Sequence, residues 1–422
     1  MLALDLIRKD PDLVRRALAR RHDDAPLDPV LELDVRRRAL MTEAEQLRAQ
    51  RNETSKRLAR MDPKPPEVIA EMRRVGDRIK GLGTEIGELQ RRMDQHLLRL
   101  PNIPRDSVPE GADESGNVVR RQWGQRRDFD FQPQPHWELA ANLGIIDFER
   151  GQKISGSRFY VLRGAGAKLQ RALIQWMLDV HVQRGYQEVY PPFMVREQVL
   201  FGSGQLPKFA ENLYRDAEED YWLIPTAEVP ITGLYAGEIL PPGALPVNHV
   251  AYTPCFRREK MSAGKDVRGI KRGHQFDKVE LYKIVAPERS DAELEALTAD
   301  AEAIVQGLGL PYRVLELCAG DLGFTAVQAY DIEMWAPGCE EWLEVSSCSN
   351  CADFQGRRAN IRFRREQGTR PEFVHTLNGS GLALPRVMIA VLENGQQADG
   401  SIVIPEALRS YTGFERISAA GV

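Results

Sequence analysis

Hydrophobic residues in the first hundred positions recur every seven residues in two separate segments. In the first segment the repeated positions are Leu33, Leu40 and Leu47, with Ala44 and Leu58 on the adjacent seam. In the second segment two series run three positions apart, Met72, Ile79, Ile86 and Met93, and Val75, Leu82 and Leu89. A seven-residue repeat buries a narrow stripe of one helix against a partner helix, as in a coiled coil.

The two segments are separated by the proline-rich stretch Met61–Pro66, which cannot continue a helix. The pattern therefore predicts a long antiparallel helical hairpin of about thirty residues per arm, and each arm would reach on the order of 45 Å. Glycines at 76, 81, 83 and 87 each cost a helix about 1 kcal/mol relative to alanine, and they argue against a uniformly straight second arm.

The faces of this hairpin away from the seam are rich in basic residues. On the first helix these are Arg36, Arg37, Arg38, Arg48, Arg51, Lys56, Arg57 and Arg60, and on the second Arg73, Arg74, Arg78, Lys80, Arg91 and Arg92. They fit either a solvated coiled-coil surface, which composition alone favours, or a surface that binds phosphates.

The composition changes after the hairpin, so we divide the chain into a helical arm at residues 1–100, a linker at 101–118 and a second domain at 119–422. The linker is rich in proline, glycine and acidic residues. Strand-like runs are predicted at residues 157–162, 187–190, 221–224, 250–256, 276–285, 312–316, 330–334 and 341–345, and helices at 167–182 and 387–392. Since regular crossover helices rarely separate these strands, the pattern predicts an α+β fold with an antiparallel sheet.

Bulk composition indicates a soluble globular protein. Of 422 residues 42% are hydrophobic and 28% charged, and 57 basic residues stand against 61 acidic ones, so that any contact with nucleic acid must come from a local patch. Five cysteines do not suggest a disulfide framework, and neither a secretory signal nor a run of about 18 apolar residues is found. We therefore expect a cytoplasmic protein with no membrane partner.

Short polar motifs in the second domain, referred to below as constellations, contain the candidate catalytic and binding residues. They are Thr226–Glu228 after a strand-like run, Phe256–Glu259, Arg272–Glu280, Glu344–Asn350 after a strand, and Asn378–Arg386 before an apolar helix. Singly, each has an ordinary explanation, such as a surface ion pair, a loop or a turn. Together they supply what ATP-dependent activation of a carboxylate needs: arginines for phosphates, hard oxygens for magnesium, and carboxylates for an ammonium group. Neither GxxxxGK[ST] nor GxGxxG is present.

These constellations resemble the motifs of class II aminoacyl-tRNA synthetases. Phe256–Glu259 looks like motif 2, Gly379–Arg386 like motif 3, and Gly185–Pro192 like motif 1. Within that class the strings GSGQLPKF, IPTAEVP, TPCFRRE, HQFDKVE, EVSSCSN and HTLNGSG are similar to seryl-tRNA synthetases, as are the hairpin and the PNIP linker. The resemblance covers residues 1 to about 417. It implies an enzyme that activates L-serine with ATP and transfers the seryl group to tRNA(Ser), and to tRNA(Sec) where that tRNA exists.

The resemblance also implies a role for each site residue. Arg257 would hold the α-phosphate, Arg386 the γ-phosphate, and Glu344 and Ser347 a Mg²⁺ ion. Glu259 would contact adenine and Phe276 would stack on it. The implied catalytic residues are Arg257, Arg386 and Glu344; the ATP-binding residues are Arg257, Arg258, Glu259, Phe276, Glu344, Val345, Ser346, Ser347 and Arg386; and the serine-binding residues are Thr226, Ala227, Glu228, Arg257, Glu280 and Ser380. Arg258 stands where relatives often have a smaller residue.

Members of this family are homodimers whose hairpin grips tRNA bound chiefly by the other subunit. That resemblance reverses the preference stated above and favours phosphate binding by the basic faces.

Three alternatives were weighed against this interpretation. Cys348 and Cys351 could bind zinc if Cys318 or Cys339 joined them, but the serine-site strings leave no need for zinc, so Mg²⁺ is the expected metal. An amino acid–carrier-protein ligase would lack the hairpin. A non-catalytic RNA-binding paralogue would be expected to lose Arg257, Glu344 or Arg386, which are all present.

Overall fold

A computed structural model describes residues 1–63, 65–260 and 268–419, in two compact units. The smaller unit comprises residues 2–19 and 23–101, and the larger comprises residues 1, 20–22 and 102–422. Lys64, within the predicted hairpin turn, lies outside the described residues.

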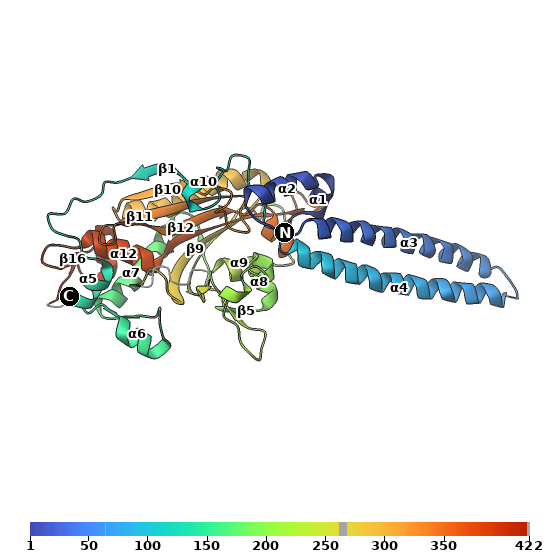
Figure 1. Cartoon of the computed structure of the whole chain (residues 1–422), viewed down its shortest axis with the longest axis horizontal. Helices are drawn as coiled ribbons and strands as arrows, with labels where there is room; N and C mark the ends of the chain where they lie inside the picture. The colour runs from blue at the N-terminus through green and yellow to red at the C-terminus, as the bar shows by residue number, and fades with distance from the viewer. Residues whose placement is uncertain (64, 261–267, 420–422) are drawn as a thin grey trace. The chain divides into compact units, whose positions relative to one another are not determined.

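The smaller unit is helical, with α1 (Leu4–Lys9), α2 (Pro11–Arg20), α3 (Asp28–Leu58) and α4 (Pro66–Leu97). Helices α3 and α4 pack along one another as an antiparallel pair (Figure 1), which confirms the predicted hairpin. The buried positions follow the seven-residue pattern: Leu33, Ala44, Leu58, Ile79, Leu82, Leu89 and Met93. The glycines do not interrupt α4, which is helical throughout. Among the described residues no helix is long and apolar enough to cross a membrane.

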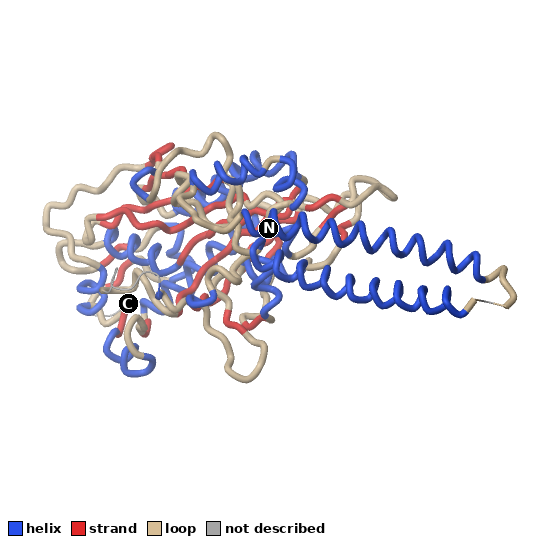
Figure 2. Tube along the Cα trace, turned by 45° about the vertical axis from the view of Figure 1, so that its right-hand side comes forward, coloured by secondary structure: helices blue, strands red, loops and turns tan. Residues whose placement is uncertain are grey.

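The larger unit is built on a sheet in the order β1-β10-β11-β12-β15-β9-β8-β4, shown in red in Figure 2. Its strands are β1 (Val118–Trp123), β4 (Gln187–Glu188), β8 (Val247–Phe256), β9 (Gln275–Val285), β10 (Tyr312–Glu316), β11 (Gln328–Ala336), β12 (Glu341–Asn350) and β15 (His375–Ala383). Neighbours pair antiparallel except β4 and β8, which are parallel. The predicted α+β fold with an antiparallel sheet is therefore confirmed.

One face of this sheet is covered by α7 (Ala165–Gln183), α10 (Ser290–Gly307) and α12 (Leu384–Gly395), which run along the strands (Figure 1). Side chains alternate between the two faces of a strand. On β9 the apolar Val279 and Leu281 point into the core shared with the helices, whereas Lys278 and Glu280 point to the opposite face. Around Lys278 and Glu280 the opposite face is polar and carries the candidate site, whereas Tyr282 and Ile284 further along β9 belong to a second apolar cluster.

Shorter elements complete the larger unit. They are η1 (Glu114–Gly116), α5 (His136–Asn142), β2 (Ile146–Asp147), α6 (Phe148–Ser155), β3 (Val161–Leu162), β5 (Met194–Val195), α8 (Glu197–Ser203), η2 (Ala210–Asn212), β6 (Trp222–Leu223), α9 (Glu228–Leu234), β7 (Ile239–Leu240), η4 (Pro287–Arg289), α11 (Phe354–Arg358), β13 (Arg362–Phe363), β14 (Glu372–Phe373), β16 (Ile402–Val403), α13 (Glu406–Thr412) and β17 (Arg416–Ile417).

The local structure of three segments differs from what the sequence suggested. Residues 344–350 were expected to follow a strand, but β12 continues through Asn350. The glycines before α12 had an ordinary explanation as a turn, but the segment forms the buried strand β15. Its glycines are needed for close packing, because a Cβ on Gly379 would lie 2.9 Å from Cys348 Sγ and one on Gly381 would lie 2.7 Å from His181 Nε2. Of the predicted strand 157–162, only Val161–Leu162 is one.

The segment after the hairpin is fixed to the larger unit. The Asn102 side-chain amide donates to the carbonyl oxygens of Thr325 at 2.8 Å and Cys351 at 2.9 Å. Val108 is buried with Leu317 and Leu322. The division at residues 100 and 118 stays a prediction.

Candidate active site

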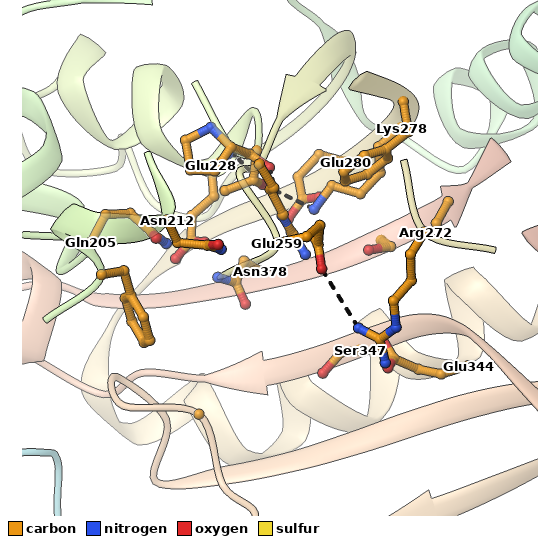
Figure 3. A pocket seen from close by; sticks show the side chains of 18 of the residues that line it. Gln205, Asn212, Glu228, Glu259, Arg272, Lys278, Glu280, Glu344, Ser347 and Asn378 are labelled. Carbon is orange, nitrogen blue, oxygen red and sulfur yellow. Dashed lines mark hydrogen bonds and ion pairs between the residues drawn. The ribbon is translucent and has the colours of Figure 1, made fainter. Parts of the chain in front are cut away.

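A cavity of about 460 Å³ opens on the polar face of the large sheet (Figure 3). Strands β8, β9, β12 and β15 converge there with the start of α9 and the first turn of α12. Most of the residues predicted from sequence line it: Thr226, Glu228, Arg257, Glu259, Phe276, Glu280, Glu344, Ser347, Ser380 and Arg386. These side chains come from segments up to 160 residues apart, Thr226 to Arg386, and the sheet brings them together.

One end of the cavity is acidic. Glu228 and Glu280 are both buried there, with 7% and 2% of their surfaces exposed. The Lys278 ammonium lies 2.5 Å from Glu280 Oε2 and donates to the Thr226 hydroxyl at 2.9 Å. Ser380 lies on β15 opposite Glu280 on β9. This end therefore offers carboxylates and hydroxyls to a small cationic, hydroxyl-bearing ligand.

The acids at this end have raised pKa values. Burial raises the pKa of Glu228 to about 7, and repulsion by Glu280 adds to the shift, against hydrogen bonds from Gln355 and Asn378. Burial also raises the pKa of Glu280, against the attraction of Lys278. An ammonium group bound beside Glu228 would favour the ionised form of its carboxyl group.

The other end of the cavity is basic. The Arg257 guanidinium lies 5.1 Å from the centre of the Phe276 ring, and its Nε donates to the carbonyl oxygen of Pro225 at 3.3 Å. Arg386 Nη1 donates to the backbone oxygen of Glu344 at 2.7 Å and lies 3.2 Å from Glu344 Oε2. Guanidinium groups stay charged at all working pH values and bind two oxygens at once, which suits phosphates.

Glu259 and Arg272 face one another across the cavity, with Glu259 Oε2 3.7 Å from Arg272 Nη1 (Figure 3). Glu259 has a positive φ of 50°, in the left-handed region that few non-glycine residues adopt. The backbone at the end of β8 thus turns sharply to bring this side chain into the cavity.

Glu344 and Ser347 could hold a hard metal ion. The Glu344 side chain is 46% exposed within the cavity, and although burial acts to raise its pKa, the nearby Arg386, Arg257 and Arg272 lower it, so the carboxylate is ionised. Ser347 also lines the cavity, near Glu344 (Figure 3), and stands opposite Asp331 on the neighbouring strand β11. An ionised carboxylate beside a hydroxyl is a donor set that suits Mg²⁺.

The cysteines considered for zinc are placed differently. Cys348 and Cys351 are buried, and burial raises the pKa of each thiol to about 12, so neither is a thiolate. Cys348 Sγ lies against Gly379 and Leu297 in the core. In the described part of the chain, the group of three possible metal ligands that the structure brings together is His136, Cys339 and Glu393, which do not line the cavity.

Some residues predicted from sequence do not line the cavity. Ala227 is fully buried, and Val345 and Ser346 are each 1% exposed, with the Ser346 hydroxyl donating to the Ser380 carbonyl at 2.6 Å. Arg258 lies 5.8 Å from the Tyr214 ring centre. These residues can act on a ligand through backbone atoms or through the residues that they support.

Other lining residues were not assigned roles from the sequence: Gln205, Asn212, Lys271, Arg272, Lys278, Ser349 and Asn378. Arg272 and Lys278 both belong to the motif Arg272–Glu280. Because side chains alternate along a strand, the sequence could have placed Lys278 on the same face of β9 as Glu280. Asn378 also alternates with Ser380, but only once β15 is recognised as a strand.

Comparisons with known proteins agree with this geometry. Residues 1–104 match the seryl-tRNA synthetase N-terminal domain, and residues 209–395 match the class II tRNA synthetase core domain for G, H, P, S and T. The chain is 62% identical over 420 residues to a serine–tRNA ligase of Thermomicrobium roseum, covering 99% of this chain and 94% of that protein. It is also 62% identical to a serine–tRNA ligase of a Roseiflexus species, covering 98% of each.

Solved structures show the same likeness. A seryl-tRNA synthetase from Pyrococcus horikoshii complexed with ATP superposes with a TM-score of 0.95 at 40% identity, covering all of both chains. A cytoplasmic serine–tRNA ligase from Naegleria fowleri in complex with AMP gives a TM-score of 0.89 at 30% identity over 99% of each chain.

Proposed function

This chain belongs to the seryl-tRNA synthetase family and is an ATP-dependent serine–tRNA ligase, and we propose that the acidic end of its cavity binds serine while the basic end binds ATP. The observation that carries this assignment is the separation of charge within one cavity. Glu228 and Glu280 are buried beside Lys278. Arg386 is bonded to Glu344, and Arg257 lies between the two groups, where its charge lowers the pKa of both Glu280 and Glu344.

In the first step the serine carboxylate attacks the α-phosphorus of ATP, a P–O bond forms, and pyrophosphate leaves with the electrons of the broken P–O bond. A carboxylate is ionised at neutral pH, so no general base is required. Catalysis then rests on placing the reactants and on stabilising charge at the phosphates. Arg257 would bind the α-phosphate, Arg386 the γ-phosphate, and Phe276 and Glu259 the adenine.

Mg²⁺ would be held by Glu344 and Ser347 and would neutralise charge on the phosphates. Ser347 pairs with Asp331 across strands β12 and β11, which fixes the backbone that carries the Ser347 hydroxyl. Arg386 bonds both the backbone oxygen and the side chain of Glu344, so the γ-phosphate ligand and the metal ligand hold one another in place.

Serine would be recognised by Thr226, Glu228, Glu280 and Ser380. The carboxylates pair with its ammonium group and accept a hydrogen bond from its hydroxyl. A site built to bond a hydroxyl rejects the analogue that lacks it by about 10⁴–10⁵-fold, because its buried polar groups are left without partners. Alanine is therefore excluded because it lacks the hydroxyl that these polar groups bond, whereas threonine is excluded only by the steric bulk of its extra methyl group.

In the second step the terminal ribose hydroxyl of tRNA attacks the carbonyl carbon of seryl-adenylate, and AMP leaves. We propose that the basic faces of α3 and α4 hold the tRNA backbone, at tRNA(Ser) and, where present, tRNA(Sec). Arg48, Arg51, Arg57, Arg73 and Arg91 are exposed, as phosphate contacts require. The presence of this hairpin disfavours a carrier-protein ligase, and Arg257, Glu344 and Arg386 disfavour a non-catalytic paralogue. We propose that the enzyme acts in the cytoplasm, together with its tRNA substrates.

We further propose a homodimer. Large apolar side chains are exposed near the motif 1 segment: Tyr190 is 75% exposed, Met194 51% and Val182 44%. Strand β4, in the same segment, forms an edge of the large sheet. Exposed apolar side chains gathered around one sheet edge are typical of a subunit interface. Sedimentation equilibrium of the wild type and a Tyr190→Asp variant would test this, since a monomeric wild type would contradict it.

The assignment is tested by ATP–pyrophosphate exchange with each of the twenty amino acids, in the absence of tRNA. Exchange that depends on serine, and is lost in Arg257→Ala, would support the division of the cavity. Exchange that persists in Arg257→Ala, or that another amino acid supports better, would overturn it. Absence of exchange by folded protein would favour the RNA-binding paralogue.

A further inference from the structure

Outside the cavity, His136, Cys339 and Glu393 form a buried cluster whose candidate ligand atoms lie within 4.8 Å of one another. His136 opens α5, Cys339 lies between β11 and β12, and Glu393 is near the end of α12. The His136 and Glu393 side chains are fully buried. A buried carboxylate and imidazole this far from the reactants need a physical reason, because burying charge is costly unless every polar atom is satisfied.

The hydrogen bonds indicate that the cluster is not a metal site but a structural connection from Glu393 through His136 to Ile270, called the relay below. Glu393 Oε1 accepts from the His136 backbone and Nδ1, both at 2.9 Å, and from Cys339 Sγ at 3.0 Å. Glu393 Oε2 accepts from the backbone N–H of Gly338 at 2.9 Å and of Cys339 at 3.0 Å. Both carboxylate oxygens are thus already occupied by donors, which also lower the pKa of Glu393.

The histidine tautomer follows from its other partner. His136 Nε2 lies 3.1 Å from the backbone nitrogen of Ile270, which can only donate. Nε2 must therefore be the unprotonated nitrogen, and Nδ1 carries the proton that it gives to Glu393. A metal bound at Nδ1 would require the opposite tautomer and would break the bond to Ile270.

The relay reaches the ATP end of the cavity. Ile270 is followed by Lys271, Arg272 and Gly273, which line the cavity. The Lys271 carbonyl lies 3.5 Å from Arg386 Nε. Arg386 is on the same helix as Glu393, seven residues before it, which is about two turns. The fit at Gly269 is close, because a Cβ there would lie 1.9 Å from His136 Nε2.

We propose that His136 is a positioning residue that holds residues 269–272 against the ATP end of the cavity through its Nε2, with Glu393 fixing the ring from α12. The segment that carries Arg272 and the helix that carries Arg386 are thereby joined through one imidazole. The proposal rests on the assignment of the basic end to ATP. It predicts that loss of the Nε2 acceptor weakens ATP binding while leaving serine binding intact.

Two substitutions distinguish the contributions of the two ring nitrogens, Nδ1 and Nε2, of His136. In His136→Asn the side-chain amide can still donate to Glu393, as Nδ1 does, but nothing reaches Ile270. In His136→Gln the longer side chain can place its carbonyl oxygen near the position of Nε2 and accept from Ile270. We expect KM for ATP in pyrophosphate exchange to rise about tenfold in His136→Asn, with KM for serine unchanged within about twofold, and His136→Gln to recover most of the loss.

His249→Gln is the matched control. His249 is also a buried histidine, bonded to the Tyr235 hydroxyl at 2.6 Å, and it does not line the cavity. Its replacement should lower the melting temperature without a selective change in KM for ATP. Equal increases in both KM values for His136→Asn, or no difference between the Asn and Gln variants, would reduce the cluster to a stabilising role and overturn the proposal.

A variant that leaves His136 in place guards against a folding failure. In Gly269→Ala the added methyl group must displace the backbone from Nε2, and the φ of 73° at this position disfavours alanine as well. The same selective rise in KM for ATP is expected; an unchanged value in folded protein would refute the relay. ATP binding in the absence of serine, measured by calorimetry, tests the relay separately from the proposed function. Weakened binding in His136→Asn supports the relay even if serine-dependent exchange, and with it the proposed function, failed.

Discussion

Lys278 forms an ion pair with Glu280, its Nζ lying 2.5 Å from Glu280 Oε2, and thereby neutralises one of the two acids at the serine end of the cavity. Glu228 instead accepts a hydrogen bond from the Gln355 amide and keeps a pKa of about 7. The two carboxylates therefore lie in different electrostatic surroundings, and the ammonium group of the substrate completes the set of charges.

This difference predicts the pH dependence of serine binding. Below about pH 7 Glu228 is protonated, and an ammonium ion binds a neutral carboxyl group less well than a carboxylate. KM for serine should therefore fall as the pH rises from 6 to 8, and it should rise by up to about tenfold for each pH unit below the pKa. Serine-dependent pyrophosphate exchange measured across this range would show it.

Glu228→Gln supplies the comparison for this prediction. The amide keeps the shape of the side chain but cannot ionise, so KM for serine should be higher than in the wild type and nearly independent of pH between 6 and 8. A variant whose KM retains the wild-type pH profile would assign the titration to another group.

A second prediction concerns Arg386, which bonds Glu344 twice. Arg386→Ala should lower kcat for pyrophosphate exchange by about 10²–10³-fold, since a charged donor aimed at the phosphates is lost. Arg386→Lys should recover little, because an ammonium group cannot bond two oxygens in a plane. Arg365→Ala, which removes a surface arginine paired with Glu288 and Glu372, is the control and should retain wild-type rates.

The parts of the fold that sequence predicted well are those with local periodicity. The seven-residue series through Leu82 and Leu89 needs only one partner helix, and both residues are buried in the hairpin as expected. Strand β10 was predicted with the bounds that the structure gives it. Strand β15 was missed because its glycines are required by close packing against Cys348 and His181, which are distant in sequence.

The same limit applies to the site. Motifs predicted the side chains that line the cavity from β8, β9, β12 and α12, since each motif is a short string on one element. The bonds of Glu393 to His136 and Cys339 depend on how distant elements pack, so no local pattern predicts them. Lys278 and Glu280 are different, because they alternate on one strand and their shared face could have been predicted.

A third prediction separates the hairpin from the cavity. Arg51 and Arg57 are exposed on α3, and in the described part of the chain no ion pair is found for either. Replacing both with alanine should raise KM for tRNA and reduce the salt dependence of tRNA binding by about two counterions, while pyrophosphate exchange stays unchanged. Arg78→Ala should have a smaller effect, because Arg78 already pairs with Glu43 at 2.8 Å and Glu85 at 3.4 Å. A loss of exchange in the double variant would show that the substitutions disturb the fold instead.

The fourth prediction concerns the glycines of α4. Gly81 and Gly83 lie in a continuous helix, and a Cβ added at either would have no other atom within 4 Å. Replacing each with alanine should stabilise the hairpin by about 1 kcal/mol, since alanine restricts the unfolded chain without a clash. Native-state hydrogen exchange of α4 amides in the full chain would measure this as slower exchange. Gly307→Ala is the contrast. Gly307 is also helical, as the last residue of α10, but its Cβ would lie 2.8 Å from the Trp176 ring, so that variant should be less stable. If Gly83→Ala stabilises the hairpin but raises KM for tRNA, the glycine serves close approach of the RNA backbone; if KM is unchanged, the substitution affects stability alone.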